Sequence, residues 1–266
     1  MEENISPPVP GWVARLDGHK SDLAACEQSL KSPFDPSCER VMESGKLFWA
    51  LRSSTFNHCQ TADEVRVSAI TLIKHLNGVL KLTRDAEPLK FDGVSRIDEG
   101  GQIHTAYFAE FHDRARATDS FILAEFRDAQ GDLVPPPPPE LSVAQKWMKA
   151  AESCGDIADA LRHFGQPTNW YDMWTTYEII EDAIWNATPN QSRPKGDTTK
   201  KRKPRRVLSM SREWVSENDF EKFAESCNYH RHGARTQPKP NQNATRDEAR
   251  GILVQILRGW LNEKVP

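Results

Sequence analysis

The sequence lacks the short motifs by which many enzymes are identified. It has no Walker loop, no G-x-G-x-x-G and no G-x-S-x-G, which argues against the nucleotide-binding and hydrolase folds that carry them. No stretch approaches the roughly 20 apolar residues of a membrane span. Residues 1–10 have neither the charged start nor the apolar run of a secretory signal. We therefore expect a cytoplasmic protein with no membrane partner.

Cysteine is scarce and irregularly spaced. The five cysteines form no C-x-x-C pair and match no disulfide framework, which favours reduced thiols in a reducing compartment. Asp17, His19 and Asp22 could contact a metal, and His104 and His112 would share one face of a strand. Neither set has a complete ligand count, so we predict no metal and no cofactor.

Charge is unevenly divided between the two halves of the chain. Residues 1–140 contain 15 Lys+Arg and 22 Asp+Glu, a net charge of −7. Residues 141–266 contain 20 Lys+Arg and 16 Asp+Glu, a net charge of +4. The second half can therefore hold a polyanion, and the acidic first half favours a basic protein partner.

The first half predicts an α+β domain over residues 11–134, after a flexible tail at 1–10. Thr61 and Glu64 have the spacing of a capping box at the start of a helix over 61–77, which Asn77-Gly78 would end. Strands are expected at Val79–Thr83, Leu89–Ile97, Gln102–His112 and Ser120–Arg127, with a hairpin turn at residues 98–101. We expect an antiparallel meander packed on the helix.

The run Pro135–Pro139 predicts a stiff polyproline hinge over residues 135–140. Beyond it, residues 141–266 predict a four-helix bundle. Its helices are expected at Ser142–Leu161, Asn169–Ile184, Ser216–Cys227 and after Thr245, which forms a second capping box with Glu248. The predicted buried face of the last helix is Ile252, Leu253, Ile256, Leu257, Trp260 and Leu261. The fold class is therefore α+β, an antiparallel sheet with a helix followed by an all-α bundle.

The densest group of reactive side chains lies where the third bundle helix should end. Asn228, Arg231 and His232 place a carboxamide, a guanidinium and an imidazole within five residues. An imidazole can move a proton near neutral pH, and a guanidinium can hold a phosphate. Metal-free RNA cleavage needs these two roles. Two alternatives remain: an ordinary polar helix end, and a metal site of Cys227, His230 and His232.

The segment Asn228–Gly233, at the end of a helix in an expected bundle, resembles the HEPN family. Asn228, His232 and Gly233 fit the family motif, whose leading Arg position is occupied by Cys227. The resemblance implies a helical bundle that binds RNA or cleaves it without metal, in a bacterial antiviral defence or toxin-type system. It also implies catalytic roles for Asn228, Arg231 and His232, and a homodimer through the helical domain.

A basic loop is predicted over residues 188–209. Such a loop can follow a phosphate backbone, and Trp214 beyond it offers a surface for base stacking. The predicted nucleic-acid-binding residues are Lys200, Lys201, Arg202, Lys203, Arg205 and Arg206. A solvated loop is the alternative reading of the same run.

An aromatic helix precedes this loop. Trp170, Tyr171, Trp174 and Tyr177 form either a core stripe or a stacking surface. The acidic residues of the same helix, Glu178, Glu181 and Asp182, could pair with Arg231.

The function that best fits these features is RNA binding or cleavage of HEPN type; an enzyme of this kind would be a metal-independent ribonuclease. The alternative is a non-catalytic adaptor that docks partners through an acidic first half and a basic second half.

Overall fold

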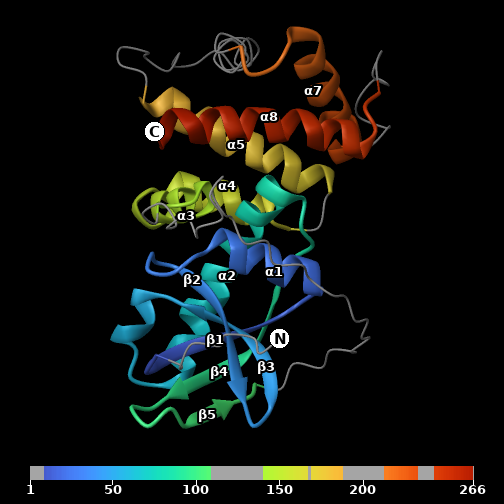
Figure 1. The fold of residues 1–266 in the computed structure, drawn as a ribbon. Coiled ribbons are helices and arrows are strands. Elements are labelled where there is room, and N and C mark those ends of the chain that lie inside the picture. The colour runs from blue at the N-terminus through green and yellow to red at the C-terminus, as the bar shows by residue number, and fades with distance from the viewer. Residues whose placement is uncertain (1–8, 109–139, 167–168, 188–212, 233–242, 266) are drawn as a thin grey trace, which may run out of the picture. The chain divides into compact units, whose positions relative to one another are not determined.

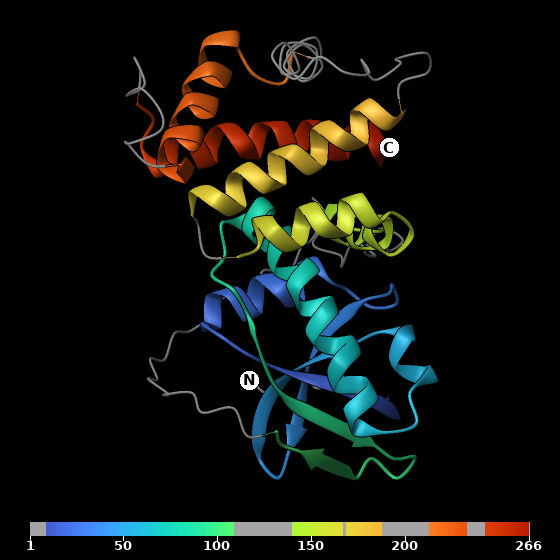
Figure 2. The ribbon, with the colours of Figure 1, turned by 180° about the vertical axis from the view of Figure 1, so that it is seen from behind.

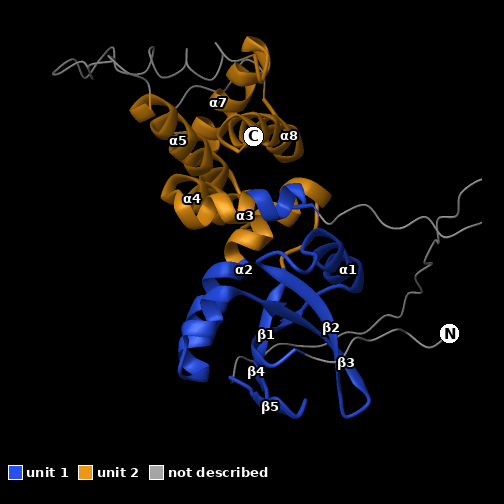
Figure 3. Ribbon diagram, turned by 60° about the vertical axis from the view of Figure 1, so that its left-hand side comes forward, with its two compact units in different colours: residues 1–73, 89–146 blue, residues 74–88, 147–266 orange. Residues whose placement is uncertain are grey.

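The computed structural model describes residues 9–108, 140–166, 169–187, 213–232 and 243–265 (Figure 1). It confirms an α+β fold, in which an antiparallel sheet with helices precedes a mostly helical region. The chain divides into two compact units, Met1–Ile73 with Leu89–Lys146 and Lys74–Pro88 with Trp147–Pro266 (Figure 3). Each unit is described by itself below.

The first unit contains a five-stranded sheet in the order β2-β3-β1-β4-β5, with every neighbouring pair antiparallel. The strands are β1 (Gly11–Asp17), β2 (Ser37–Glu43), β3 (Lys46–Arg52), β4 (Lys90–Ile97) and β5 (Ile103–Ala106). The expected meander is wrong, because β1 lies at the centre between β3 and β4. The sequence analysis missed β1 to β3, which are short and bounded by polar turns.

The turn between β4 and β5 is the predicted hairpin turn at residues 98–101. The Asp98 carboxylate accepts from the backbone N–H groups of Gly100 at 2.9 Å and Gln102 at 2.8 Å. Gly101 has φ 78°, a conformation that glycine adopts without a steric cost. The prediction of a strand at Leu89–Ile97 is likewise confirmed. The predicted strand Ser120–Arg127 lies outside the described residues.

The sheet is strongly curled. Its edge strands β2 and β5 meet where Thr105 Oγ1 donates to Glu43 Oε1 at 2.8 Å. In a flat five-stranded sheet the edge strands would lie about 19 Å apart. Curling makes one face concave, and that face is lined by Val13, Val41, Phe48, Ala50 and Ile97.

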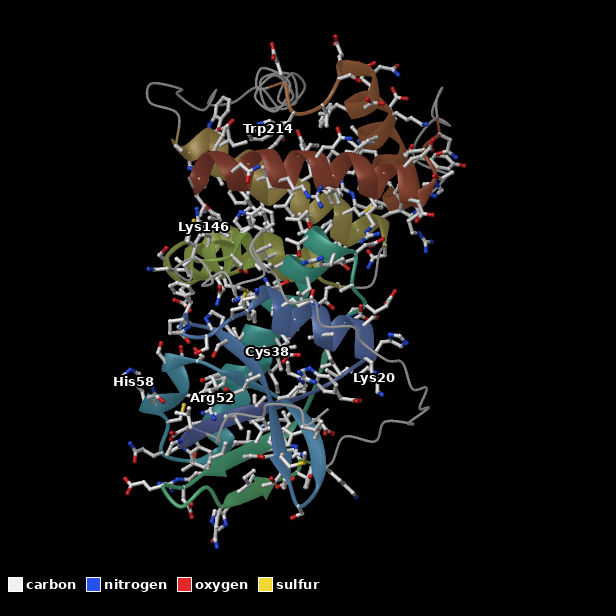
Figure 4. The ribbon with its side chains drawn as sticks, viewed as in Figure 1. Lys20, Cys38, Arg52, His58, Lys146 and Trp214 are labelled. Atoms are coloured by element: carbon white, nitrogen blue, oxygen red, sulfur yellow. The ribbon has the colours of Figure 1, made fainter. Side chains whose placement is uncertain are left out.

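Helices cover the opposite face of the sheet (Figure 2). The helix α1 (Lys20–Ser29) begins at His19, whose imidazole accepts from the Ser21 N–H. Its Cys26 contacts Cys38 of β2, and this contact together with burial raises the pKa of the Cys38 thiol well above its usual value. Side chains fill the space between α1 and the sheet, where Cys38 is labelled in Figure 4. A short 3₁₀ helix, η1 (Ser54–His58), follows β3.

The helix α2 (Ala62–Arg84) belongs to the first unit as far as Ile73 and to the second unit from Lys74. The predicted capping box is present, since Glu64 N–H donates to Thr61 Oγ1 at 3.3 Å and Thr61 N–H donates to Glu64 Oε2 at 3.4 Å. The predicted end at Gly78 and the predicted strand Val79–Thr83 are wrong. A Cβ at Gly78 would lie 2.1 Å from the Leu161 carbonyl oxygen, so Gly78 permits close helix packing instead of ending the helix.

The second unit is helical. In the described residues it contains the end of α2, most of α3 (Val143–Ser153), and α4 (Gly155–Phe164), α5 (Trp170–Ala187), α7 (Glu217–His232) and α8 (Arg246–Lys264). The single helix predicted at Ser142–Leu161 is wrong, because Cys154 has the extended φ of −134° and Gly155 restarts the chain as α4. The predicted hinge at 135–140 lies almost wholly outside the described residues. The second unit also includes residues 74–88, which the sequence analysis assigned to the first domain.

The core of the second unit lies where α5, α7 and α8 pack together. Phe220 and Phe223 of α7 contact Tyr177 of α5, with ring centroids 5.1 and 5.8 Å apart. The predicted capping box of α8 is confirmed, and hydrogen bonds from Lys222 and Thr245 lower the pKa of Glu248 to about 2. The predicted inward face of α8 is buried at all six positions.

Candidate nucleic-acid interface

The helix α7 carries the three predicted site residues on its last two turns. Ser216 starts the helix by accepting from the Asp219 N–H at 3.1 Å. The last turn holds His230, Arg231 and His232, where positive charge complements the helix dipole. The attraction between basic side chains and the negative end of the helix dipole acts within the last turn. It explains why basic residues occur here whatever their function.

The side chains of Asn228, Arg231 and His232 converge. Arg231 Nη2 lies 2.8 Å and Nε 3.1 Å from His232 Nε2, so that nitrogen accepts from the guanidinium. Arg231 Nη2 also donates to Asn228 Oδ1 at 3.4 Å. The guanidinium therefore holds a carboxamide and an imidazole on either side of itself.

The helix α5 supplies a second wall for this group. The guanidinium carbon of Arg231 lies 5.1 Å from the centre of the Trp174 ring, within cation–π range. Arg231 Nη1 lies 3.8 Å from Glu178 Oε2, so one of the predicted carboxylate partners is confirmed. The other two do not pair with Arg231 in the described residues, and Glu181 instead accepts from the Tyr177 hydroxyl.

An aromatic stack extends the same wall. The rings of Trp170 and His230 lie 4.4 Å apart and within 10° of parallel. Tyr171 beside them is 63% exposed, whereas Trp174 and Tyr177 are buried. Both alternatives for the aromatic helix therefore hold in part. Trp174 and Tyr177 belong to the core, and the first turn of α5 reaches the surface next to α7.

Cys227, which stands where the HEPN resemblance would require an arginine, cannot supply a cation. Its side chain is fully buried, and burial raises the pKa of the thiol to about 12. The thiol is therefore neutral near pH 7 and points into the core. Arg231, one turn further along α7, is the cation that the structure brings to His232.

The metal alternatives gain no support from the geometry. His230 and His232 are exposed while Cys227 is buried, and His19 of the other set caps α1. Across the described residues, no three His, Cys, Asp or Glu side chains gather closely enough to hold an ion.

The remaining predicted nucleic-acid contacts are the basic loop and Trp214. The basic residues Lys200, Lys201, Arg202, Lys203, Arg205 and Arg206 lie outside the described residues. Trp214, labelled in Figure 4, packs on α8, since a Cβ at Gly259 would lie 2.5 Å from its ring. Trp214 therefore serves packing within the second unit and is a poor surface for base stacking.

The sequence analysis missed a polar cluster on the concave face of the sheet. Arg15 Nη1 donates to Glu43 Oε2 at 2.7 Å, to Thr105 Oγ1 at 3.3 Å and to Ser95 Oγ at 3.4 Å. The guanidinium also lies 3.8 Å from the centre of the Phe48 ring. The alternation of β1 places Arg15 on the same face as Val13, which was the available signal.

Comparison of the chain with protein-family models, curated proteins and solved structures finds no match in any of the three. Within the described part of the chain, no helix combines the length and apolar character needed to cross a membrane.

Proposed function

We propose that the helical unit binds RNA at the C-terminal end of α7. The observation that supports this proposal best is the convergence of Asn228, Arg231 and His232, with Arg231 as the central cation. A guanidinium can accept a phosphate, and the Trp170–His230 pair beside it offers an aromatic surface to a base. The net charge of +4 in residues 141–266 favours a polyanion.

The same group has the parts for metal-independent RNA cleavage. The substrate phosphate would replace His232 Nε2 as the acceptor of the Arg231 N–H groups. The ribose 2′-hydroxyl then attacks the adjacent phosphorus, and the freed His232 Nε2 accepts its proton. The 5′-oxygen leaves with a proton from water, so the products carry a 2′,3′-cyclic phosphate and a 5′-hydroxyl. Arg231 would stabilise the charge that develops on the phosphate. Because Cys227 supplies no cation, RNA binding is the primary proposal. RNA cleavage by the same residues is the more specific proposal, and it depends on RNA binding.

The test is an RNA-binding titration of the full-length protein with a labelled single-stranded oligoribonucleotide. The buffer contains a chelator, so that metal ions take no part. The affinity should fall with salt, because phosphate contacts release counterions. Arg231→Met should weaken binding roughly tenfold and reduce the salt slope by about 0.7, the contribution of one single-strand phosphate contact. Lys264→Met is the matched control, because Lys264 is an exposed cation on α8. A flat salt response in the wild type would contradict the proposal.

Cleavage is tested in the same samples. His232→Ala should abolish any cutting, and His104→Ala should not, since His104 is an exposed imidazole in the first unit. A substrate with 2′-deoxyribose at the cut site should resist cleavage. Cutting that survives His232→Ala removes that residue from the mechanism and leaves the binding proposal to stand alone.

A non-catalytic adaptor is the second candidate. The observation that favours it is the contact of Arg231 with Glu178, which already gives the guanidinium a counter-charge. An adaptor would show no affinity for RNA at any salt concentration. The molar mass of the purified protein in solution tests the homodimer that the HEPN resemblance implies.

A further inference from the structure

A small hollow in the second unit carries a separate inference. It lies where the first turn of α5 meets the end of α4, with α2 and α8 also contributing side chains. Its enclosed volume is about 10 Å³, room for one water, and it opens to solvent on one side. The lining residues are Lys81, His163, Phe164, Gln166, Asn169, Asp172, Met173 and Arg250.

Lys81 is a buried cation without a close counter-charge. Its side chain belongs to a residue that is 9% exposed, and Nζ donates to the Gln166 carbonyl oxygen at 2.5 Å. Among the described residues, no carboxylate lies within ion-pair distance of Nζ; Asp85 and Glu87 are nearby but exposed. Buried ammonium groups are normally paired, because their loss of hydration costs free energy. Burial and the charge of Arg250 lower the pKa of Lys81.

Arg250 brings a second cation to the hollow. Its Nη2 donates to Asp85, whose carboxylate is largely exposed. Its Nε is buried and has no hydrogen-bond partner among the described residues. The lining therefore includes a guanidinium with one N–H that has no partner among the described residues, and an ammonium that donates to a carbonyl oxygen and has further N–H groups to offer.

The one carboxylate in the lining does not neutralise these cations. Asp172 Oδ1 lies 3.2 Å from His163 Nδ1, and Asp172 Oδ2 accepts from the Asn169 carboxamide. Asn169 also starts α5 by accepting from the Asp172 N–H at 2.8 Å, so the positive end of that helix dipole lies at the hollow. The Asp172 and Asp85 carboxylates balance the two cations in number, but neither carboxylate lies within ion-pair distance of Lys81 Nζ.

We propose that this hollow binds a phosphate group through Lys81 and Arg250. The enclosed space admits one oxygen atom, while the rest of the phosphate stays at the open mouth. Lys81 Nζ then gains a counter-ion and the Arg250 guanidinium gains an acceptor for its remaining donors. The group arrives either as free phosphate or on the end of a nucleic acid. This site uses none of Asn228, Arg231 and His232, and it does not depend on RNA binding at α7.

The experiment titrates the full-length protein with inorganic phosphate, with chloride at equal ionic strength as the reference. Binding to the folded state should raise Tm in proportion to the logarithm of the phosphate concentration once that concentration exceeds Kd, and isothermal calorimetry should give a saturable isotherm with the same Kd. Lys81→Met should weaken phosphate roughly tenfold, which corresponds to about 1.4 kcal/mol. Lys74→Met is the matched control, because Lys74 is an exposed cation on the same helix.

A second pair of variants guards against misfolding. Arg250→Met should also weaken phosphate, and Arg246→Met, an exposed arginine one turn earlier on α8, should leave it unchanged. Without phosphate, Lys81→Met should unfold no earlier than the wild type, since an unpaired ammonium has been removed. A Tm that rises no more in phosphate than in chloride at equal ionic strength, or equal Kd values for the wild type, Lys81→Met and Arg250→Met, would overturn the proposal.

Two oligoribonucleotide arms distinguish the sources of the phosphate. Tighter binding of a 5′-phosphorylated strand than of its 5′-hydroxyl counterpart, lost in Lys81→Met, supports a nucleic-acid end. Saturable binding of inorganic phosphate with no preference between the strands supports free phosphate. Arg231→Met should weaken RNA binding at α7 and leave the phosphate titration unchanged, so failure of one proposal does not resemble failure of the other.

Discussion

Arg15 in the first unit and Arg231 in the second occupy very different surroundings. The Arg15 side chain is 10% exposed and donates three hydrogen bonds to side chains on three other strands. Arg231 has a side chain 17% exposed, and its polar partners are a neighbouring helix residue, one residue a turn away and the half-exposed Glu178. The Arg15 guanidinium links four strands of the sheet, whereas the Arg231 guanidinium contacts residues at the end of α7 and one residue of α5.

The difference indicates that the charge of Arg15 stabilises the fold, whereas the charge of Arg231 is available to a binding partner. Breaking a largely buried ion pair by removing one partner is costly, and Arg15, Glu43, Ser95 and Thr105 are joined to one another by hydrogen bonds. A surface pair contributes little to folding because water competes for both charges. The first cluster should therefore matter to stability, and the second to binding.

The largest expected effect on stability comes from placing an arginine at residue 227. Cys227→Arg should destabilise the protein by about 4 kcal/mol or more, because a charged side chain would replace a fully buried thiol. Urea unfolding measures the loss. Glu225→Arg, an exposed position on the same helix, should change stability by less than about 0.5 kcal/mol. Similar stability of the two variants would show that α7 can turn residue 227 outward.

Arg15→Met should cost about 3 kcal/mol, because it leaves Glu43 on the concave face without its cation. Arg40→Met on β2 is the matched control, since the Arg40–Glu27 pair is exposed and should contribute less than about 1 kcal/mol. Chemical denaturation of both variants checks the difference. A double variant that also replaces Glu43 by Met should recover part of the loss; a double variant as unstable as the sum of its parts would contradict a coupled cluster.

The pH dependence of the first cluster is the third prediction. Burial would raise the pKa of Glu43, but hydrogen bonds from Arg15 and Thr105 prevail and lower it. A lowered pKa means that Glu43 stabilises the fold above the ordinary carboxyl range of about 4.3, and that this stability is lost as pH falls through the lowered value. Glu43→Gln should therefore cost about 1 kcal/mol at neutral pH and progressively less in acid. A cost independent of pH would contradict this sign.

The smallest effect on stability is expected for Arg231→Met, at less than about 1 kcal/mol, because its ion pair is near the surface. The same variant should lose most of its affinity for RNA, as proposed above. Thermal unfolding of the binding samples provides the check. A stability loss comparable to that of Arg15→Met would mean that the α7 end serves folding, which would remove the contrast between the two arginines.

Both capping boxes were predictable from the sequence, and so was the hairpin turn at Asp98. In each case the hydrogen bonds join groups no more than four residues apart, so residue type and spacing are enough to specify them. Asn228 and His232 belong to the same class, because one turn of helix brings them together. Their convergence on Arg231 was therefore a reasonable expectation, whereas the Trp170–His230 stack required two helices to meet.

The sequence by itself determined the α+β class, the starts of α2 and α8 and the buried stripe of α8, because local hydrogen bonds and hydrophobic periodicity depend only on near neighbours. Only the tertiary structure decided the role of Gly78, which resembles a helix end until the Leu161 carbonyl is placed against it. It also decided the curl of the sheet, where Glu43 and Thr105 meet across 62 residues of chain. Contacts of this range depend on how elements pack, and no short pattern of residues encodes them.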